Sequence, residues 1–150
     1  MSYFPEIDNA EAIFTEFLAT SHTANNSKII WNTTPRSTGT TGVSIDSSGN
    51  ITLNGGRNYW LIASMDVTRN STGRDVDMYW LDSQDNLLDA NQGASPIFYK
   101  MANSPTSNAA AMFAADVTIN TTRTISLKYT GTFNLTIHTS MSLLCIELKR

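Results

Sequence analysis

The segment Ser140-Met141-Ser142-Leu143-Leu144-Cys145-Ile146-Glu147-Leu148 carries apolar side chains on both of its alternating faces. Successive side chains of a strand point to opposite sides, so one face holds Leu144, Ile146 and Leu148 and the other holds Met141, Leu143 and Cys145. A strand of an antiparallel sandwich needs only one apolar face, because its other face meets water. One face of this strand therefore packs inside its own domain. We expect a second copy of the chain to cover the other.

Turn-forming segments divide most of the chain into short apolar runs. Asp46-Ser47-Ser48-Gly49-Asn50 and Asn54-Gly55-Gly56-Arg57 are two of these turns. The turns recur about every 8–12 residues, which is typical of an all-β sandwich or barrel. The predicted strands are 28–32, 43–46, 51–53, 58–69, 76–82, 86–90, 97–101, 109–119, 123–129, 133–139 and 140–148. The sequence therefore predicts an all-β antiparallel sandwich of about ten strands.

Residues 8–20 have the pattern of a short amphipathic helix. Asp8 or Asn9 is a suitable cap, and the apolar residues follow at i, i+1, i+4 and i+5. We expect residues 1–27 to form an N-terminal arm that ends in a polar linker, and residues 28–150 to form the sandwich domain. The residues expected to anchor this arm to a larger particle are Phe4, Ile13, Phe14, Phe17 and Leu18.

The composition excludes several classes of function. The chain has 150 residues, the size of one domain, and a formal net charge of -3 with a pI near 5.2. Its basic residues are scattered, whereas a nucleic-acid site needs them clustered. No apolar run approaches the roughly 20 residues of a membrane span. Thr, Ser and Asn supply 50 of the 150 residues, so hydroxyls and amides are expected to solvate most of the surface.

Signatures of catalysis are missing from the sequence. It has no G-x-S-x-G elbow, no phosphate-binding glycine loop and no H-E-x-x-H motif. His22 and His138 are too isolated to suggest a zinc site. Cys145, the one cysteine, lies in the most apolar strand and is expected to be buried and inert. We expect no catalytic residue, metal or cofactor, and a small polysaccharide hydrolase is the least favoured alternative.

Three stretches together resemble a known superfamily. Gly55–Ser64 looks like the G-x-Y-x-x-x-A strand of the tumour necrosis factor and complement globular-head superfamily, and Leu143–Leu148 resembles its closing strand. Thr121–Tyr129 lies where that family has a G-D-x-V-x-L strand, although Thr122-Arg123 stands in place of Gly-Asp. The Phe-x-Gly-Phe of the complement heads is absent. The resemblance covers roughly residues 28–150 and implies a ten-stranded jelly roll that trimerises through its inner sheet.

Small, Thr- and Asn-rich, Cys-poor versions of this jelly roll are similar to those of bacteriophage virion proteins. The resemblance thus implies a non-enzymatic homotrimer of a phage virion, made in the host cytoplasm, as a head decoration or a fibre knob. The arm would bind other virion proteins. The residues expected at the trimer interface are Trp60, Ile62, Leu143, Leu144 and Ile146.

A receptor-binding tip that recognises a host glycan or surface protein is the alternative within binding proteins. Its expected ligand loop contains Asp82 and Asp85, with Tyr99 as a further contact. A calcium site is a second interpretation of the acidic residues between 75 and 89, because carboxylates are hard ligands. Their spacing does not match a calcium loop, and Asp is also favoured in hairpin turns for its local hydrogen bonds.

Overall fold

The computed structural model describes residues 11–20, 26–33, 35–68, 74–95, 97–101, 106–131 and 141–149. These residues form twelve strands and one short 3-10 helix, η1 (Ala90–Gln92). The strands are β1 (Ala12–Ala19), β2 (Ser27–Lys28), β3 (Arg36–Ser37), β4 (Val43–Ile45), β5 (Ile51–Asn54), β6 (Arg57–Thr68), β7 (Arg74–Asp82), β8 (Ala94–Ser95), β9 (Ile97–Met101), β10 (Thr106–Val117), β11 (Thr122–Gly131) and β12 (Met141–Lys149). The predicted all-β class is confirmed.

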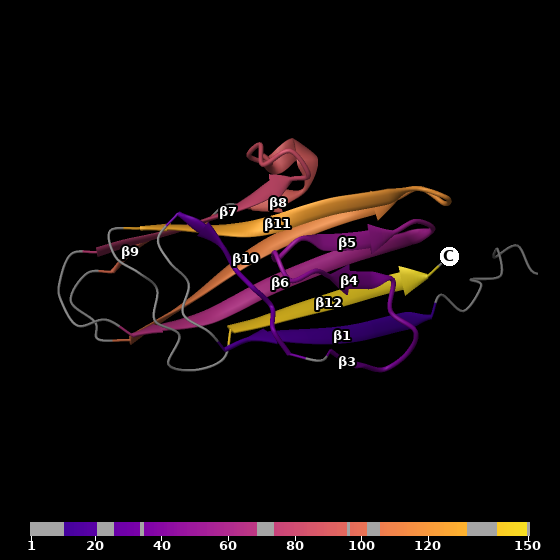
Figure 1. Ribbon diagram of the computed structural model, residues 1–150, viewed down its shortest axis with the longest axis horizontal. Coiled ribbons are helices and arrows are strands. Elements are labelled where there is room, and N and C mark those ends of the chain that lie inside the picture. The colour runs from indigo at the N-terminus through magenta and orange to yellow at the C-terminus, as the bar shows by residue number, and fades with distance from the viewer. Residues whose placement is uncertain are drawn as a thin grey trace, which may run out of the picture.

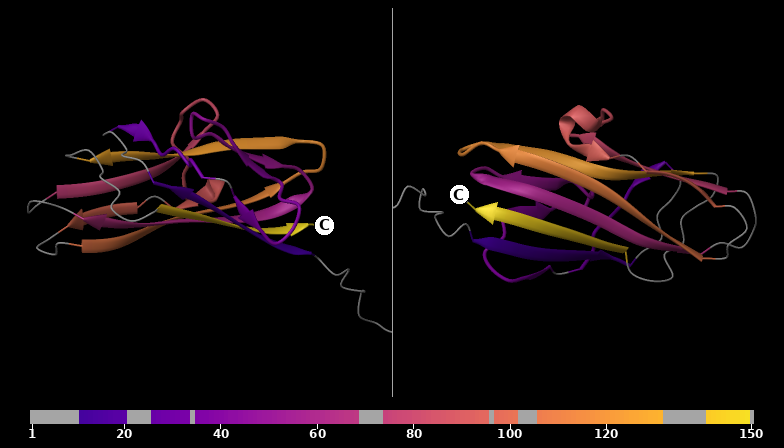
Figure 2. Two further views of the ribbon diagram at one scale, coloured as in Figure 1. Left: turned by 60° about the horizontal axis from the view of Figure 1, so that its bottom comes forward. Right: turned by 180° about the vertical axis from the view of Figure 1, so that it is seen from behind.

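Two antiparallel sheets form the sandwich (Figures 1 and 2). The first, which we call the β12 sheet, has the order β3-β1-β12-β6-β10-β8. The second, the β11 sheet, has the order β4-β5-β11-β7-β9, and β2 also pairs with β11. Strands distant in the sequence are thus neighbours, as in a jelly roll, and β12 lies inside its sheet between β1 and β6.

The core lies between the two sheets and is built from alternate residues of their strands. Trp80 of β7 and Phe113 of β10 meet across it with their ring centroids 5.6 Å apart. Tyr59, Tyr129 and Leu61 are also among the large side chains that are almost completely buried. Side chains packed to this degree on both sheets fix which face of each strand points inward.

The predicted helix over residues 8–20 is wrong where the structure describes it, because residues 12–19 form the strand β1. β1 pairs with β12 along its whole length, from Ala12 opposite Leu148 to Ala19 opposite Met141. Its burial alternates with a period of two, and this puts Thr15 in the core. The apolar residues of this segment fit both the helical period of about 3.6 and the strand period of two. A helix this short is only marginally stable, so pairing with β12 decides in favour of the strand. Residues expected in an arm before residue 28 therefore belong to the sandwich.

Other predicted strands differ in extent. Of residues 28–32, only Lys28 lies in a strand, β2. Residues 86–90 form no ladder beyond one bridge between Leu87 and Leu81, and the chain then enters η1 through a capping box of Asp89 and Gln92. Capping hydrogen bonds thus replace strand pairing in this segment. The predicted strand 133–139 lies outside the described residues.

Candidate oligomer interface on the β12 sheet

The last strand, β12, has apolar side chains on both faces, as the sequence predicts. Met141, Leu143 and Cys145 are completely buried in the core. Leu144 and Ile146 alternate with them, are partly exposed, and point away from the β11 sheet, and Leu148 is exposed on the same side. The sandwich therefore covers one face of β12 and leaves the other open.

Neighbouring strands extend this open face into a continuous apolar surface. Cross-strand pairing aligns Phe14 of β1, Ile146 of β12, Trp60 of β6 and Ala114 of β10 in one row. The next row contains Glu16, Leu144, Ile62 and Met112. We call the side chains of Phe14, Leu18, Trp60, Ile62, Met112, Ala114, Leu144, Ile146 and Leu148 the apolar face.

Most of the large apolar side chains that are exposed to solvent lie on the apolar face. Trp60 is 57 % exposed, Met112 52 % and Phe14 45 %. With Leu148, they make four of the six large apolar side chains that are exposed in the described part of the chain. Single exposed apolar residues are normal, but a contiguous set indicates an interaction site. The face is also rich in the residue types that concentrate at interfaces, above all Trp60.

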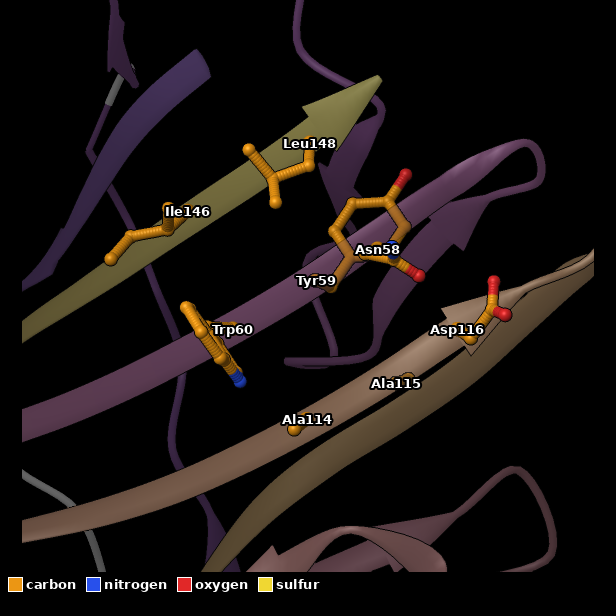
Figure 3. A pocket seen from close by; sticks show the side chains of 8 residues that line it. All are labelled: Asn58, Tyr59, Trp60, Ala114, Ala115, Asp116, Ile146 and Leu148. Carbon is orange, nitrogen blue, oxygen red and sulfur yellow. The ribbon is translucent and has the colours of Figure 1, made fainter. Parts of the chain in front are cut away.

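A groove of about 330 Å³ crosses the apolar face at three neighbouring strands (Figure 3). Trp60 projects from β6 between Ile146 of β12 and Ala114 of β10. Asn58 and Asp116 lie at one end of the groove, in the row of Leu148. The small side chain of Ala114 leaves the space beside the indole open. The groove is thus mainly apolar, with polar groups at one end.

Glu16, which borders the apolar face on β1, is paired inside the chain. The Glu16 carboxylate accepts hydrogen bonds from the Arg36 guanidinium and, over 3.1 Å, from the Ser142 hydroxyl. The Arg36 hydrogen bond, and to a smaller extent that of Ser142, lowers the pKa of Glu16. Arg36 belongs to the edge strand β3, so this pair forms a polar margin beside the apolar side chains. An apolar centre with a polar rim is the usual anatomy of a protein interface.

Beneath the apolar face, a buried ion pair holds the end of β12 in place. The Glu147 side chain has no exposed surface, and its Oε2 accepts hydrogen bonds from Arg57 Nη1 at 2.7 Å and from the Gly42 amide at 2.8 Å. The Thr41 hydroxyl donates to Oε1. Thr41 and Gly42 lie where the chain passes from β3 in one sheet to β4 in the other. We call Glu147, Arg57, Thr41 and Gly42 the Glu147 clamp.

Tyr59 packs beside the clamp and explains why residue 42 is glycine. The Tyr59 hydroxyl donates to the Asn54 carbonyl at 2.7 Å. Burial, together with the Glu147 charge, raises the pKa of Tyr59 to about 12. A Cβ on residue 42 would lie 2.4 Å from the Tyr59 oxygen. The close approach of this loop to β6 therefore excludes any side chain there.

Four of the five expected interface residues lie on the apolar face: Trp60, Ile62, Leu144 and Ile146. The fifth, Leu143, was assigned wrongly, because it is completely buried in the core. Sequence reasoning missed Phe14, because it was placed on a helix, and Met112, because it lies in an Ala-rich strand. Period-two alternation along β1 and β10 is the sequence signal that would have placed both residues on this face.

Four of the five residues expected to anchor an arm lie in the strand β1. Ile13 and Phe17 are buried in the sandwich and therefore do not contact another particle. Phe14 and Leu18 lie on the apolar face of β1. Phe4 lies outside the described residues. The alternation of β1 explains the division, because residues one apart point to opposite sides of the sheet.

Two of the residues expected in a ligand loop, Asp82 and Asp85, have partners within the chain. Asp82 Oδ1 accepts the amides of Gln84 at 2.8 Å and Asn86 at 2.9 Å, and the bonds from Asn86 contribute most to lowering the Asp82 pKa. Asp85 Oδ1 is 2.6 Å from Lys28 Nζ. Among the described residues, no three or more His, Cys, Asp or Glu side chains are grouped as a metal site would require. The side chain of Tyr99 is not among those described.

Comparisons with known proteins show a likeness to solved structures. No family model matches the chain, and no curated protein matches it. The chain is similar to the globular domain of zebrafish complement 1qA protein, with 12 % identity, a TM-score of 0.46, and coverage of 94 % of this chain and 97 % of that one. A likeness at this level has no bearing on what the chain binds. In the described part of the chain, no helix is both long and apolar enough to span a membrane.

Proposed function

We propose that the chain is a non-enzymatic structural module that assembles into a homotrimer through the apolar face. The observation that carries this proposal is the continuous apolar surface over β1, β12, β6 and β10, with Trp60 57 % exposed at its centre. Full burial of each large apolar side chain is worth about 1.5–3 kcal/mol. Three partly exposed side chains, Trp60, Phe14 and Met112, already represent several kcal/mol for each copy.

A second copy of the chain is the partner that fits this surface best. Glu16, the carboxylate in the row of Leu144, is already paired with Arg36, so its burial leaves no unpaired charge in that row. Most soluble oligomers are homo-oligomers with closed symmetry. The number three comes from the superfamily that the sequence resembles, in which the sheet containing the closing strand forms the trimer contact.

Light scattering on the full chain tests this assembly. We expect a particle of three times the 16.5 kDa of one chain at micromolar concentration. Trp60→Glu should give monomers or insoluble protein, because it places a charge at the centre of the face. Leu87→Glu is the matched control, since Leu87 is 63 % exposed but lies beside the β11 sheet. A monomeric wild-type chain contradicts the proposal, as does a Trp60→Glu trimer as stable as the control.

We further propose that the trimer is a component of a bacteriophage virion, either a head decoration or a fibre knob. This part rests on the resemblance of the Thr- and Asn-rich sequence to phage jelly rolls. Because β1 is a strand of the sandwich, attachment to other virion proteins is left to residues before Glu11. Deletion of residues 2–10 should then leave the trimer intact and abolish attachment, and loss of the trimer instead contradicts this division. Genes for capsid or tail proteins beside the gene would show which particle is involved, and neighbours of neither kind would contradict the virion role.

A receptor-binding tip has less support. The carboxylates expected to hold a glycan are occupied, Asp82 in its own turn and Asp85 with Lys28. Glycan-array binding by the wild-type trimer that Asp82→Ala abolishes would favour this alternative.

A further inference from the structure

The symmetry of a trimer requires two different contact patches on each copy. A contact around a three-fold axis is heterologous, so a given patch meets a different patch on the next copy. The apolar face must therefore supply both a receiving part and a projecting part.

The groove beside Trp60 is the receiving part. Its volume of about 330 Å³ lies beside the indole, between the row of Trp60 and Ala114 and the row of Asn58 and Asp116. A cavity of about 150 Å³ in an apolar core holds a benzene molecule. The groove thus has room for one phenyl ring without movement of its walls.

Phe14 is the projecting part. Its side chain is 45 % exposed on β1, which lies on the opposite side of β12 from β6. Neighbouring strands are about 4.8 Å apart, so Phe14 lies roughly 10 Å from Trp60 within one chain, with Ile146 between them. A Phe14 side chain therefore does not fill the groove of its own copy.

The strand register places Phe14 and the groove at the same level along the strand direction, which we call their height. Rotation about an axis that runs along the strands moves a residue around the axis and leaves its height unchanged. Phe14 is in the same cross-strand row as Ile146, Trp60 and Ala114. Figure 3 shows those three residues at the groove. With the three-fold axis along the strands, Phe14 meets the next copy at the level of the groove. Met112 lies in the following row, opposite Ile62.

The polarity of the rows supports the same pairing. On the open face of the β12 sheet, four rows cross β1, β12, β6 and β10 in the described residues, and of these the row of Phe14 is apolar at all four positions. The other rows each contain a polar member: Asp116 with Asn58, Glu16, or Ser142 with Ser64. Burial without a hydrogen-bond partner is costly for polar groups. The row of Phe14 can thus be buried most completely.

We propose that Phe14 of one copy fills the groove between Trp60 and Ala114 of the next copy, which rests on the proposed homotrimer. Each copy offers one Phe14 and one groove, so a closed ring of three copies fills every groove and buries every Phe14.

Complementary substitutions test this pairing. Ala114→Trp fills the groove from within and should raise the protomer concentration of half-dissociation about tenfold or more. Adding Phe14→Ala should restore most of the loss, because the incoming ring is removed. Adding Leu18→Ala, on the same face of β1 but two rows away, is the matched control and should not restore it. Equal effects of Phe14→Ala and Leu18→Ala on the Ala114→Trp trimer overturn the pairing and leave the homotrimer standing. A monomeric wild-type chain overturns both.

Cross-linking covers the case in which Ala114→Trp fails to fold. A Phe14→Cys chain is mixed with an Ala114→Cys chain, and a short bismaleimide is added after subunit exchange. The native Cys145 is completely buried and does not compete. We expect a cross-linked pair from the mixture and from neither chain alone. Mixed trimers without that product overturn the pairing.

Discussion

Removing Arg57 from the Glu147 clamp should destabilise the fold more than removing the charge of Glu147. Arg57→Met leaves a carboxylate with no exposed surface and only two neutral donors, Thr41 and Gly42. Breaking a buried ion pair in this way costs about 3–5 kcal/mol. Glu147→Gln instead leaves Arg57, whose side chain is 13 % exposed and still donates to the Thr40 carbonyl at 2.9 Å. We expect a cost of about 1.5–3 kcal/mol, the value of a hydrogen bond to a charged group.

The combination of both changes gives the sharper test. In Arg57→Met with Glu147→Gln, no unpaired charge is buried, and the side-chain amide oxygen introduced at position 147 still accepts from the Gly42 amide. The double variant should therefore be more stable than Arg57→Met alone, by roughly 1–2 kcal/mol, so the second substitution rescues the first. Replacing a charged group by a neutral one of the same shape isolates the effect of charge from that of packing.

Urea unfolding at pH 7, followed by tryptophan fluorescence, measures these free energies. All variants must be compared at one protomer concentration, because association adds to the apparent stability of an oligomer. Thr52→Ala is a suitable control, since its hydroxyl makes a long, 3.4 Å hydrogen bond on the β11 sheet and should cost far less. A double variant less stable than Arg57→Met would refute the reasoning, because Glu147 would then not be an unpaired buried charge in the single variant.

Three further outcomes follow from the structure. Deletion of residues 1–20 should give insoluble or unfolded protein in a solubility assay, because it removes β1 with the buried Ile13 and Phe17 and exposes an edge of β12; a folded, soluble product would contradict the position of β1. Cys145→Ser should lower the free energy of unfolding by about 1–3 kcal/mol without changing the oligomer. Burial raises the pKa of the Cys145 thiol, so rapid labelling by a thiol reagent in the native protein would contradict this placement. Asp82→Asn should destabilise the protein at neutral pH, and the difference from wild type should shrink as the pH falls below about 4, since hydrogen bonds lower the pKa of Asp82 in the folded state only; a difference that stays constant with pH in acid unfolding curves would argue against that role.

The sequence by itself determined the class of the fold and its local turns. Residues 141–148 read as a strand with apolar side chains on both faces, and the Asp46 and Asp82 turns form through hydrogen bonds within five residues. Both features depend on neighbours in the chain, so local chemistry is enough to predict them.

Tertiary structure alone decided the secondary structure of residues 12–19 and which face of β12 is open. The side chains of β1 suit a helix or a strand, and pairing of Ala12 with Leu148, remote in the sequence, selects the strand. Period-two alternation shows that Leu143 and Leu144 lie on opposite faces, but both are apolar, so the pattern does not say which one is inside. The β11 sheet packs on Leu143, and the buried Glu147 on that side is held by the clamp. Contacts between distant segments thus determine which apolar surface stays open, because only they decide which surface the chain covers itself.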